Sequence, residues 1–585
     1  MFTILSKILH ILSNDQKKRI VGLAIMIFIG AFLEMLGVSL IMPIVEGVMY
    51  PEALMSSRYV AILGHFVHFE TANEVILILI ALIIFIYFFK NGYILLETYV
   101  QARFVNNNQS RTISYMLEEY LNRPYEYYLN ADIPTIFRTI DGDVPKVFTV
   151  ILQYILLFSE LMVSLILGLF LLISSPGMTI CIVAIMIVCT LIITKVLKPV
   201  LNRLGQKTQA LQSRMGKWRL QSIYGIKDVK ILNKEHYFAG SFGNYSDLNA
   251  VINSKYMVLN NLPRLLLETF CISGILIYIA GCIISGADMT TLIPKISAFA
   301  IAAMRLLPSV NRINTYISNI SYYEPSVNYV YENVDFTSYR EVGHYERLEE
   351  TYGPEIELTQ EICMKDVVYK YPDSDKLILD HASMIVPRGK SVGVMGPSGS
   401  GKSTAVDVLL GLLQMQEGQI LCDGRDIFDN YPSWLHHIGY IPQTIYLTDD
   451  SIRENIAFGV APEDIDDERV WKVLEEAQLK DKILEMPEGI ETSIGERGVR
   501  LSGGQRQRLG IARALYHDPE ILVFDEATSA LDTDTETAIM EAIDSFHGRK
   551  TLIIIAHRLR TIANCDIIYK VDGGKITTTT LENEE

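Results

Sequence analysis

The chain has 585 residues, of which 50% are hydrophobic, and it carries a formal net charge of −16 at pH 7. This length exceeds what one hydrophobic core organises, and the mean hydropathy of +0.24 is high for a soluble protein of this size. The negative charge argues against a nucleic-acid-binding protein, because such proteins carry clustered Lys and Arg that neutralise phosphates. Since the seven cysteines include no CxxC pair, we interpret them as buried, reduced thiols.

The composition changes sharply along the chain. Up to about Arg312 the apolar residues come in long runs that contain almost no charge, and after about Thr351 the chain has the composition of an ordinary soluble α/β domain. An acidic stretch with scattered aromatic residues lies between them. We therefore predict a membrane all-α domain at 1–321, a linker at 322–352 and an α/β domain at 353–585.

The first part contains segments long enough to cross a membrane. Hydrocarbon is about 30 Å thick, so a spanning helix needs roughly 20 mostly apolar residues. We predict six spans, near Ile20–Val48, Val75–Tyr99, Val147–Ile173, Met178–Leu197, Leu262–Ile284 and Leu292–Leu307. The first and fifth contain internal charges, so a buried core helix is the alternative for each of them.

Basic residues near the span ends predict the orientation, because Lys and Arg concentrate on the cytoplasmic side. The cytoplasmic set comprises Lys17, Lys18, Arg19, Lys195, Lys198, Arg203, Lys207 and Arg214. The predicted outer loops contain little positive charge, with Arg58 in the first of them. We therefore place the N-terminus and the α/β domain in the cytoplasm. Met1–Leu12 has apolar residues at helical spacing and no cleavage site, which favours an interfacial helix over a secretory signal.

Three loops have helical patterns of their own. The cytoplasmic connections Gln101–Lys146 and Val200–Tyr256 are too long for simple turns, and we expect them to reach the α/β domain through Ala131–Val144 and Ser222–Leu232. In the outer loop, apolar residues from Tyr59 to Phe69 repeat at helical spacing. This segment is either a loop helix packed on its own span or a surface helix that contacts a lipid tail.

Three basic residues, Lys90, Arg264 and Arg305, fall inside or at the edges of predicted spans. A charge at mid-membrane costs about 2.5–3.5 kcal/mol, so it faces a cavity, a partner or the interface. The first explanation is pairing with Glu34, Glu160 or Glu268, and Glu268 lies four residues after Arg264. The second is a water-filled cavity for an anionic group such as a phosphate or pyrophosphate.

The α/β domain contains a complete phosphate-binding loop. An apolar strand-like run, Ser391–Met395, precedes it, and a helical run, Ala405–Leu413, follows. The loop comprises Gly396, Pro397, Ser398, Gly399, Ser400, Gly401, Lys402, Ser403 and Thr404. Glycines let backbone N–H groups curl around phosphate oxygens, and the helix N-terminus adds its positive dipole end. Lys402 is expected to contact the outer phosphates of ATP, and Ser403 to supply a hydroxyl to Mg²⁺.

A second motif ends in two carboxylates. Ile521–Phe524 is apolar and predicts a buried strand, which Asp525 and Glu526 follow. We expect Asp525 to hold Mg²⁺ and Glu526 to polarise the attacking water. Similar strand-end positions are occupied by His557, after Ile553–Ala556, and by Gln443, after a shorter apolar run. His557 is either a satisfied core histidine or a hydrogen-bond donor to the transferred phosphate, and Gln443 is a candidate ligand of water or Mg²⁺.

Another glycine-containing turn precedes a helical run, at Leu501, Ser502, Gly503, Gly504 and Gln505. A helix N-terminus of this kind is a second anion-binding surface. Because one nucleotide needs one phosphate loop, we infer that this turn contacts the ATP held by another copy of the chain.

Together these motifs resemble the ABC ATPase family across roughly Ile356–Thr577. The resemblance implies that Tyr371 stacks on adenine, that Gln443 senses Mg²⁺ and the membrane domain, and that His557 is the switch histidine. It also implies that Leu501–Gln505 is the signature acting across a head-to-tail homodimer, with Asp532 in the D-loop. The domain order resembles the type IV exporter fold, in which Ala131–Val144, with Arg138 and Asp143, is similar to the first coupling helix.

A closer likeness covers nearly the whole chain. Phe32–Pro43 and Met304–Arg312 are similar to segments of the lipid-linked oligosaccharide flippase family of bacterial N-glycosylation. That family has an outer helix and a belt of intramembrane arginines, which Arg264 and Arg305 match. Lys90 departs from the belt, because lysine keeps the charge but lacks the bidentate fork of arginine. The likeness implies an inner-membrane flippase of a polyprenyl-diphosphate glycan. The alternatives are an exporter of drugs, peptides or other lipids, a regulatory ABC ATPase and an importer subunit.

Overall fold

The computed structural model describes residues 2–39, 71–174, 176–284, 289–336, 353–372, 374–495, 498–526, 533–556 and 558–580. The chain divides into two compact units, each with its own fold. One unit comprises Met1–Arg123 and Ala131–Glu349, and the other comprises Pro124–Asn130 and Glu350–Glu585.

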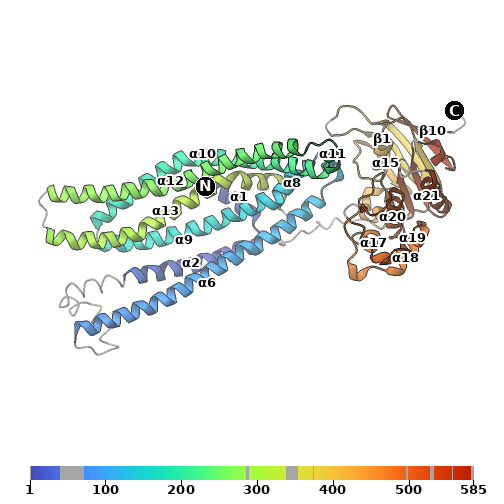
Figure 1. The fold of residues 1–585 in the computed structure, drawn as a ribbon. Helices are drawn as coiled ribbons and strands as arrows, with labels where there is room; N and C mark the ends of the chain where they lie inside the picture. Colours follow the sequence, from blue (N-terminus) through green and yellow to red (C-terminus); the bar gives the residue numbers. More distant parts are fainter. Residues whose placement is uncertain are drawn as a thin grey trace. The chain divides into compact units, whose positions relative to one another are not determined.

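The first unit is all-α in its described part. Its long helices are α2 (Asn14–Ser39), α6 (Ala72–Leu121), α9 (Val144–Ser174), α10 (Pro176–Tyr224), α12 (Glu235–Ile284) and α13 (Met289–Asn333), and they form an elongated bundle (Figure 1). The shorter elements are α1 (Phe2–Ile11), α8 (Ile133–Arg138), the π-helical turn η1 (Thr139–Asp143) and α11 (Ile226–Ile231).

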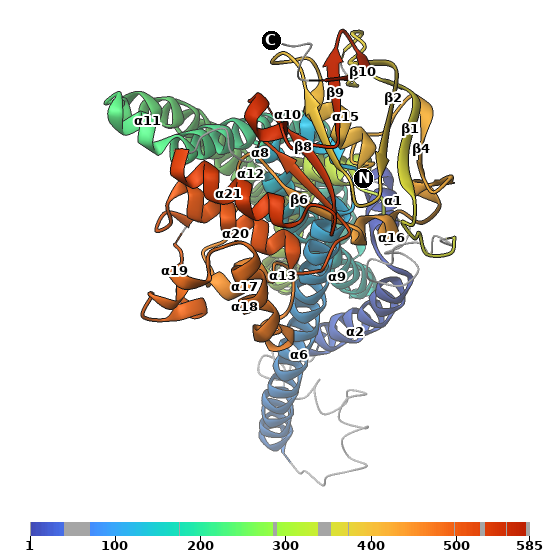
Figure 2. The same ribbon diagram turned by 90° about the vertical axis from the view of Figure 1, so that its right-hand side faces the viewer.

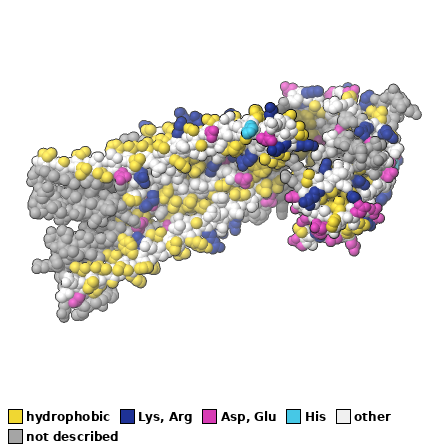
Figure 3. All heavy atoms as spheres, viewed as in Figure 1, with side chains coloured by type: hydrophobic (Ala, Val, Ile, Leu, Met, Phe, Trp, Pro, Cys, Tyr) yellow, Lys and Arg dark blue, Asp and Glu magenta, His cyan; other side chains and the backbone are white. Residues whose placement is uncertain are grey.

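Each predicted span lies on one of the long helices, the first of them as far as Ser39, where the described residues end. In the described part of the chain, three helical stretches are long and apolar enough to cross a membrane: Asn14–Leu36, Asn73–Leu121 and Ile133–Leu169. Hydrophobic side chains cover much of the bundle surface, which is the exposure that a lipid-facing helix requires (Figure 3). The outer segment Tyr59–Phe69 lies outside the described residues.

The N-terminal helix α1 is confirmed, and protein covers much of its apolar face. Ile4 and Ile8 are buried, and Leu9 remains exposed. The ammonium group of Lys7 donates a hydrogen bond to Asn328 over 2.9 Å and pairs with Glu332 at 3.0 Å, so α1 packs along the last turns of α13. The placement of α1 at a lipid interface stays a prediction.

The segment predicted as the start of the linker belongs to α13. This helix continues to Asn333, because Tyr322, Val327 and Val330 are buried against the rest of the bundle. The stretch 322–333 is therefore helical, and the described chain leaves the helix only after it.

The segment predicted as the first coupling helix is also placed differently. Arg138 and Asp143 lie at the ends of α8 and η1 inside the helical unit, where the side chain of Asp143 is fully buried. Arg138 and Gln209 donate hydrogen bonds to Oδ2 of Asp143 over 3.0 and 3.2 Å, and Ser326 donates to its Oδ1 over 2.7 Å. This network fixes η1 to α10 and α13. The segment grouped with the second unit is instead α7 (Tyr125–Leu129).

The second unit contains two sheets. The strands are β1 (Glu361–Tyr369), β2 (Leu379–Pro387), β3 (Ser391–Met395), β4 (Glu417–Cys422), β5 (Arg425–Asp426), β6 (Ile438–Ile441), β7 (Ile521–Asp525), β8 (Thr551–Ile555), β9 (Ile567–Asp572) and β10 (Lys575–Thr579). An antiparallel sheet has the order β2-β1-β4-β5, and a second sheet has the order β10-β9-β3-β8-β7-β6. In the second sheet β9, β3, β8, β7 and β6 are parallel, with β10 antiparallel on β9.

Helices cover the parallel sheet and form a separate layer beyond it. The helices of this unit are α7, α15 (Lys402–Leu409), α16 (Tyr431–His436), α17 (Ile452–Ile456), α18 (Asp467–Glu476), α19 (Lys480–Leu484), α20 (Gly503–Leu515) and α21 (Thr533–Ser545). Short 3₁₀ turns occur at Ile427–Asn430, Pro462–Asp464, Gly489–Glu491 and Leu559–Ile562. Figure 2 shows α17 to α20 gathered to one side of this unit, opposite the antiparallel sheet. Strands β3, β7 and β8 are almost entirely buried, as parallel strands covered on both faces are.

Candidate nucleotide site and charged positions of the membrane domain

The phosphate-binding loop connects the carboxyl end of β3 to the N-terminus of α15, as predicted. Gly396, Gly399 and Gly401 all have positive φ values, of 151°, 77° and 98°. A Cβ atom on Gly396 would lie 2.2 Å from the carbonyl oxygen of Val571, so no side chain fits there. The glycines thus permit a loop whose N–H groups and helix dipole suit a phosphate.

The ammonium group of Lys402 lies inside this loop. It donates hydrogen bonds to the carbonyl oxygens of Gly396 and Pro397 over 3.1 and 3.0 Å. Only 4% of the residue is exposed. Burial lowers the pKa of Lys402, and the carboxylates of Glu526 and Asp525 act in the opposite direction. The loop therefore holds a localised cation where the outer phosphates of a nucleotide would bind.

Asp525 lies at the end of β7 and is bound through both of its carboxylate oxygens. Ser403 donates to Oδ1 over 3.1 Å, and the hydroxyl of Tyr440 donates to Oδ2 over 3.1 Å. A carboxylate beside a hydroxyl is the hard oxygen donor set that Mg²⁺ prefers. The residues thus fit the ion, which would be held by Ser403 and Asp525 and would neutralise phosphate charge.

Glu526 follows directly and has a positive φ of 49°. Its backbone N–H donates to the carbonyl oxygen of Ile555 on β8 over 3.1 Å, which fixes this backbone turn. Its Oε2 accepts a hydrogen bond of 2.9 Å from the side-chain amide of Gln443, which follows β6. Two predicted catalytic residues, 83 positions apart, are therefore in direct contact.

The aromatic residue predicted to stack on adenine lies next to the loop. The hydroxyl groups of Tyr371 and Thr404 are 2.9 Å apart, and the rings of Tyr371 and Tyr369 meet edge to face at 5.4 Å. Ser398 is exposed on the loop, and Oγ of Ser400 is buried without a hydrogen-bond partner among the described residues.

The signature turn forms an N-terminal cap of α20. Ser502 accepts from the N–H of Gln505 over 3.2 Å, and the side-chain oxygen of Gln505 accepts from the N–H of Ser502 over 2.8 Å. This reciprocal capping box fixes the helix start. Ser502 and Gly503 are exposed while Gly504 is buried, so the turn presents its first two residues to solvent. Asp532 and His557 lie outside the described residues.

Sequence reasoning missed two residues near the nucleotide site. Tyr440 is one, and the hydrogen bond of its hydroxyl to Asp525 is the contact that identifies it. Asp407 on α15 is the other: burial, together with the negative charge of Asp525, raises its pKa to about 6. An acidic residue inside an apolar helical run was the available signal for Asp407.

Helix α7 contributes to the same unit. The backbone N–H of Gln414 donates to Oε1 of Glu126 over 2.9 Å. Burial raises the pKa of Tyr125, and the negative charge of nearby Asp407 raises it further. The segment Tyr125–Leu129 of the connection between α6 and α9 is therefore part of the second unit.

Known families and proteins resemble this chain over both units. The family described as ABC transporter matches residues 379–529, and the family described as ABC transporter transmembrane region matches residues 24–286. The ATP-dependent lipid A-core flippase of Desulfotalea psychrophila is 32% identical over 67% of this chain and 68% of its own length. The chain belongs to the ABC transporters.

Two further likenesses agree with this assignment. The ATP-dependent lipid A-core flippase of Cupriavidus pinatubonensis is 28% identical over 79% of this transporter and 77% of its own chain. A solved structure, described as a bacterial Atm1-family ABC exporter with ATP bound, has a TM-score of 0.79 at 23% identity and covers 97% of this chain and 96% of that one. In other alignments this transporter spans as little as 17% of the relative's own length. The transporter is an exporter half-transporter, with a transmembrane domain followed by an ATP-hydrolysing domain.

The intramembrane cations of the transporter occupy different environments. Lys90 is only 7% exposed, and its ammonium group lies over the ring of Tyr87 at 4.4 Å. By helical spacing, Lys90 shares a face of α6 with Glu97 and Gln101. This face meets α2 at Gly30, because a Cβ atom on Gly30 would lie 2.3 Å from Oε2 of Glu97. Lys90 therefore points into the α2–α6 interface.

The other predicted positions lie on α12 and α13. Arg264 is exposed, and among the described residues no ion pair joins it to Glu268. Arg305 lies on α13, and its side chain is outside the described part. Glu160 forms an ion pair with Arg312, in which Nη2 of Arg312 donates to Oε2 of Glu160 over 3.2 Å. This carboxylate therefore neutralises an arginine that was not among the three predicted intramembrane cations.

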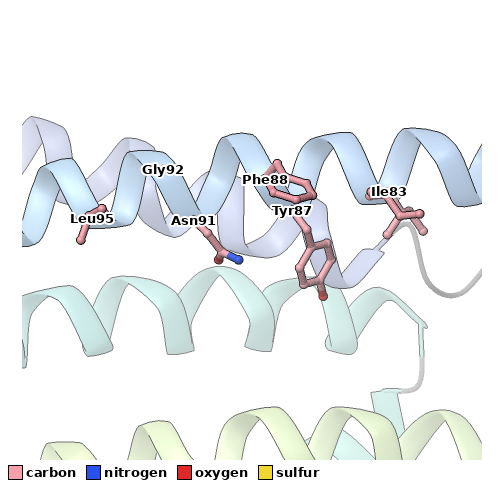
Figure 4. Close-up of a pocket in the computed structure, with 7 residues that line it drawn as sticks. Ile83, Tyr87, Phe88, Asn91, Gly92 and Leu95 are labelled. Atoms are coloured by element: carbon pink, nitrogen blue, oxygen red, sulfur yellow. The ribbon is translucent and has the colours of Figure 1, made fainter.

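An open groove of about 680 Å³ runs along α6, and Lys90 is not among its lining residues. Its lining comes from one helix and includes Ile83, Tyr87, Phe88, Asn91 and Leu95 (Figure 4). Tyr87 and Asn91 project to the same side of α6 in Figure 4. The groove is largely apolar, as a surface beside a lipid chain would be.

Proposed function

We propose that this transporter is a homodimer in the cell (inner) membrane that flips an anionic lipid-linked oligosaccharide, a polyprenyl-diphosphate glycan. Its N-terminus and ATPase domain face the cytoplasm. Binding of ATP with Mg²⁺ closes the two ATPase domains against each other, and hydrolysis reopens them.

The observation that carries the proposal is a buried cation at the depth of a membrane span. Lys90 is 7% exposed and forms no ion pair within the described residues. Burying such a charge costs about 2.5–3.5 kcal/mol at mid-membrane, which is tolerable where an anionic ligand approaches it. Arg264 and Arg305 add two further cationic positions on α12 and α13.

The names of the relatives support a lipid as cargo. Both aligned flippases are named for lipid A-core, a lipid, rather than for a drug or a peptide. The apolar groove on α6 supports an amphipathic substrate, because it offers hydrocarbon contact on the helix that carries Lys90. An exporter of drugs, peptides or other lipids is the alternative.

The decisive experiment measures flipping of a fluorescent polyprenyl-diphosphate sugar in liposomes that contain the purified protein. The unaltered protein should flip this lipid with ATP, and Glu526→Gln should not. Drugs and peptides should neither be transported nor stimulate ATP hydrolysis. Equal flipping rates for the two proteins would show that hydrolysis does not power the step.

A charge variant tests the role of Lys90. Lys90→Gln should lower flipping roughly tenfold or more, because a charged contact to phosphate is lost. The matched control is Lys18→Gln, which removes the same charge from an exposed position at the start of α2. Equal flipping by both variants would remove Lys90 from the proposal.

The homodimer is tested by mixing two inactive chains. Lys402→Ala lacks the phosphate cation, and Ser502→Ala lacks the signature hydroxyl. In a head-to-tail dimer, a mixed pair has one doubly altered site and one intact site. Mixed dimers should therefore recover ATP hydrolysis, whereas recovery would be absent if each chain completed its own site.

A further inference from the structure

A polar cleft lies between α10 and α13 of the helical unit, and neither Lys90 nor a residue of the nucleotide site is among its lining residues. Its volume is about 390 Å³, within the range of about 300–1,000 Å³ found for ligand pockets. The cleft is lined by Lys198, Pro199, Asn202, Arg203, Gln206 and Glu324. All of these residues belong to the helical unit.

The cleft begins where the fourth predicted span ends. Leu197 is the last residue of that span, and Lys198 is the first residue of the lining. Leu197 and Leu201 are buried in a cluster with Leu267 and Tyr322. Lys198 and Asn202, which directly follow the two leucines, are half-buried and lie at the rim of this cluster. By the distribution of basic residues, this level is the cytoplasmic boundary of the membrane, where lipid headgroups lie.

A glycine, Gly205, which lies between the lining residues Arg203 and Gln206, permits the close approach of α10 and α13. A Cβ atom on Gly205 would lie 2.0 Å from the carbonyl oxygen of Tyr322 and 3.3 Å from Pro325. The hydroxyl groups of Thr208 and Tyr322 are 2.9 Å apart one turn further along. Above this contact, Pro199 interrupts the backbone hydrogen bonding of α10, because proline has no N–H. Contacts between α10 and α13 therefore fix the walls of the cleft.

Its charged groups lack partners within the described residues. Lys198 and Arg203 form no ion pair there, although both line the same cleft. Glu324 lines the cleft from α13, and its Oε2 is buried without a hydrogen-bond donor among the residues that the structure describes. A buried acceptor without a donor destabilises the fold until a donor reaches it. The side-chain amide of Gln206 donates to Oδ1 of Asn202 over 3.1 Å, so this donor is directed along α10 and not toward Glu324.

We propose that this cleft binds the phosphate-bearing headgroup of a lipid in the cytoplasmic leaflet. Lys198 and Arg203 contact the phosphate oxygens, and Glu324 accepts a hydrogen bond from a hydroxyl or amine group of the same headgroup. A sugar attached to a diphosphate and the ethanolamine of a phospholipid both supply this combination of charges and donors. The identity of the bound lipid as the cargo rests on the proposed function, whereas the binding chemistry does not.

Binding is measured by fluorescence polarisation with the full-length protein in detergent micelles. The probes are a fluorescent short-chain polyprenyl-diphosphate sugar, the same diphosphate without sugar, phosphatidylethanolamine, and the corresponding polyprenol, which has no phosphate. The double variant Lys198→Gln with Arg203→Gln removes the cations. Its matched control, Lys195→Gln with Lys207→Gln, removes two exposed charges of the same helix outside the cleft.

The double variant should weaken binding of every phosphate-bearing lipid about tenfold or more, and the control should stay within about twofold of the unaltered protein. Glu324→Gln should weaken the sugar-bearing or ethanolamine-bearing lipid several-fold and leave the sugar-free diphosphate unchanged. Equal binding by the double variant and its control would overturn the site. If the double variant does not fold, the single variants Lys198→Gln and Arg203→Gln should each give part of the loss, and no loss in either would overturn it.

Competition by a hexose phosphate and binding of phosphatidylethanolamine identify the source of the phosphate. Comparison of binding with flipping separates this inference from the proposed function. A hexose phosphate that competes as strongly as the lipid would overturn a lipid as the ligand. Cleft-dependent binding of phosphatidylethanolamine in preference to the diphosphate sugar would assign the site to bulk lipid. Failure of the unaltered protein to flip the diphosphate sugar, with cleft-dependent binding intact, would remove the proposed function alone. Flipping without any cleft-dependent binding would remove this inference alone.

Discussion

The hydroxyl group of Ser403 lies 3.1 Å from Oδ1 of Asp525, although 122 positions separate the two residues. Both follow strands of one parallel sheet, in which β8 lies between β3 and β7. The carboxyl ends of parallel strands meet at the same edge, so two residues far apart in the sequence form one pair of oxygen donors that suits Mg²⁺.

Ser403→Ala should raise the Mg²⁺ concentration that gives half-maximal ATP hydrolysis by about tenfold or more, because one of two metal-binding oxygens is lost. The measurement is a Mg²⁺ titration of ATPase activity at saturating ATP. Nucleotide binding in the presence of a chelator serves as the control and should be unchanged. A variant with an unaltered Mg²⁺ requirement would contradict the assignment.

Tyr440→Phe should raise the same Mg²⁺ requirement by roughly three- to tenfold, since hydrogen bonds to charged groups contribute about 1.5–3 kcal/mol and water replaces part of the loss. The tyrosine acts by holding Oδ2 of Asp525 over 3.1 Å. Tyr446→Phe is the matched control, because that side chain is 65% exposed. If both variants shift the titration equally, Tyr440 has no positioning role.

Ser502→Ala removes a helix cap and, in the proposed dimer, a contact to the partner's nucleotide. Loss of the cap alone should cost about 1 kcal/mol of stability. Ser451→Ala provides an internal comparison, because Ser451 forms the same capping box with Glu454 at α17. Both should lower the melting temperature by a few degrees, but only Ser502→Ala should also reduce ATP hydrolysis more than about tenfold. Equal activity of the two variants would leave the signature turn with a capping role only.

Asp566 makes the stability of the ATPase unit depend on pH. Burial opposes its ionisation, but hydrogen bonds from the N–H of Ser391, over 2.8 Å, and from Lys390, over 3.0 Å, lower its pKa to about 2. A carboxylate with a depressed pKa in the folded state stabilises the fold above its unfolded pKa of about 3.9, and this stabilisation is lost as the pH falls toward 2.

Asp566→Asn should therefore lower the melting temperature at pH 7 by several degrees, and its difference from the unaltered protein should shrink as the pH falls from 4 toward 2. Thermal unfolding followed by intrinsic fluorescence measures this, since Trp434 is buried in the same unit. Asp572→Asn, at an exposed position, is the control and should have little effect at any pH. A constant difference between Asp566→Asn and the unaltered protein would contradict the linkage.

The local elements followed from the sequence. The strand at Ser391–Met395, the glycine loop and the strand before Asp525 lie where predicted, because each depends on short-range periodicity and turn chemistry. The six long helices over the predicted spans were equally predictable, since a long apolar run is a local feature of the sequence.

The ends of the long polar connections Gln101–Lys146 and Val200–Tyr256 were not predictable in the same way. The helix pattern at Ala131–Val144 was correct, but the polar pattern does not tell which turn docks on which domain. Burial of Asp143 by donors from α8, α10 and α13 fixes this segment inside the helical unit, and Tyr125–Leu129 joins the ATPase unit instead. The boundary at 322 failed for a related reason, because long-range packing of Tyr322 and Val327 keeps α13 helical beyond the apolar run.

The sequence by itself determined that an all-α unit precedes an α/β unit, where the long helices lie and where the glycine loop joins a strand to a helix, because these depend on composition and on residues near one another in the chain. Only the tertiary structure decided which side chains meet. Tyr440 reaches Asp525, Gln443 reaches Glu526, and Glu324 faces Lys198 across two helices. The physical reason is that such contacts arise where separate elements pack, and no local pattern specifies the distance between them.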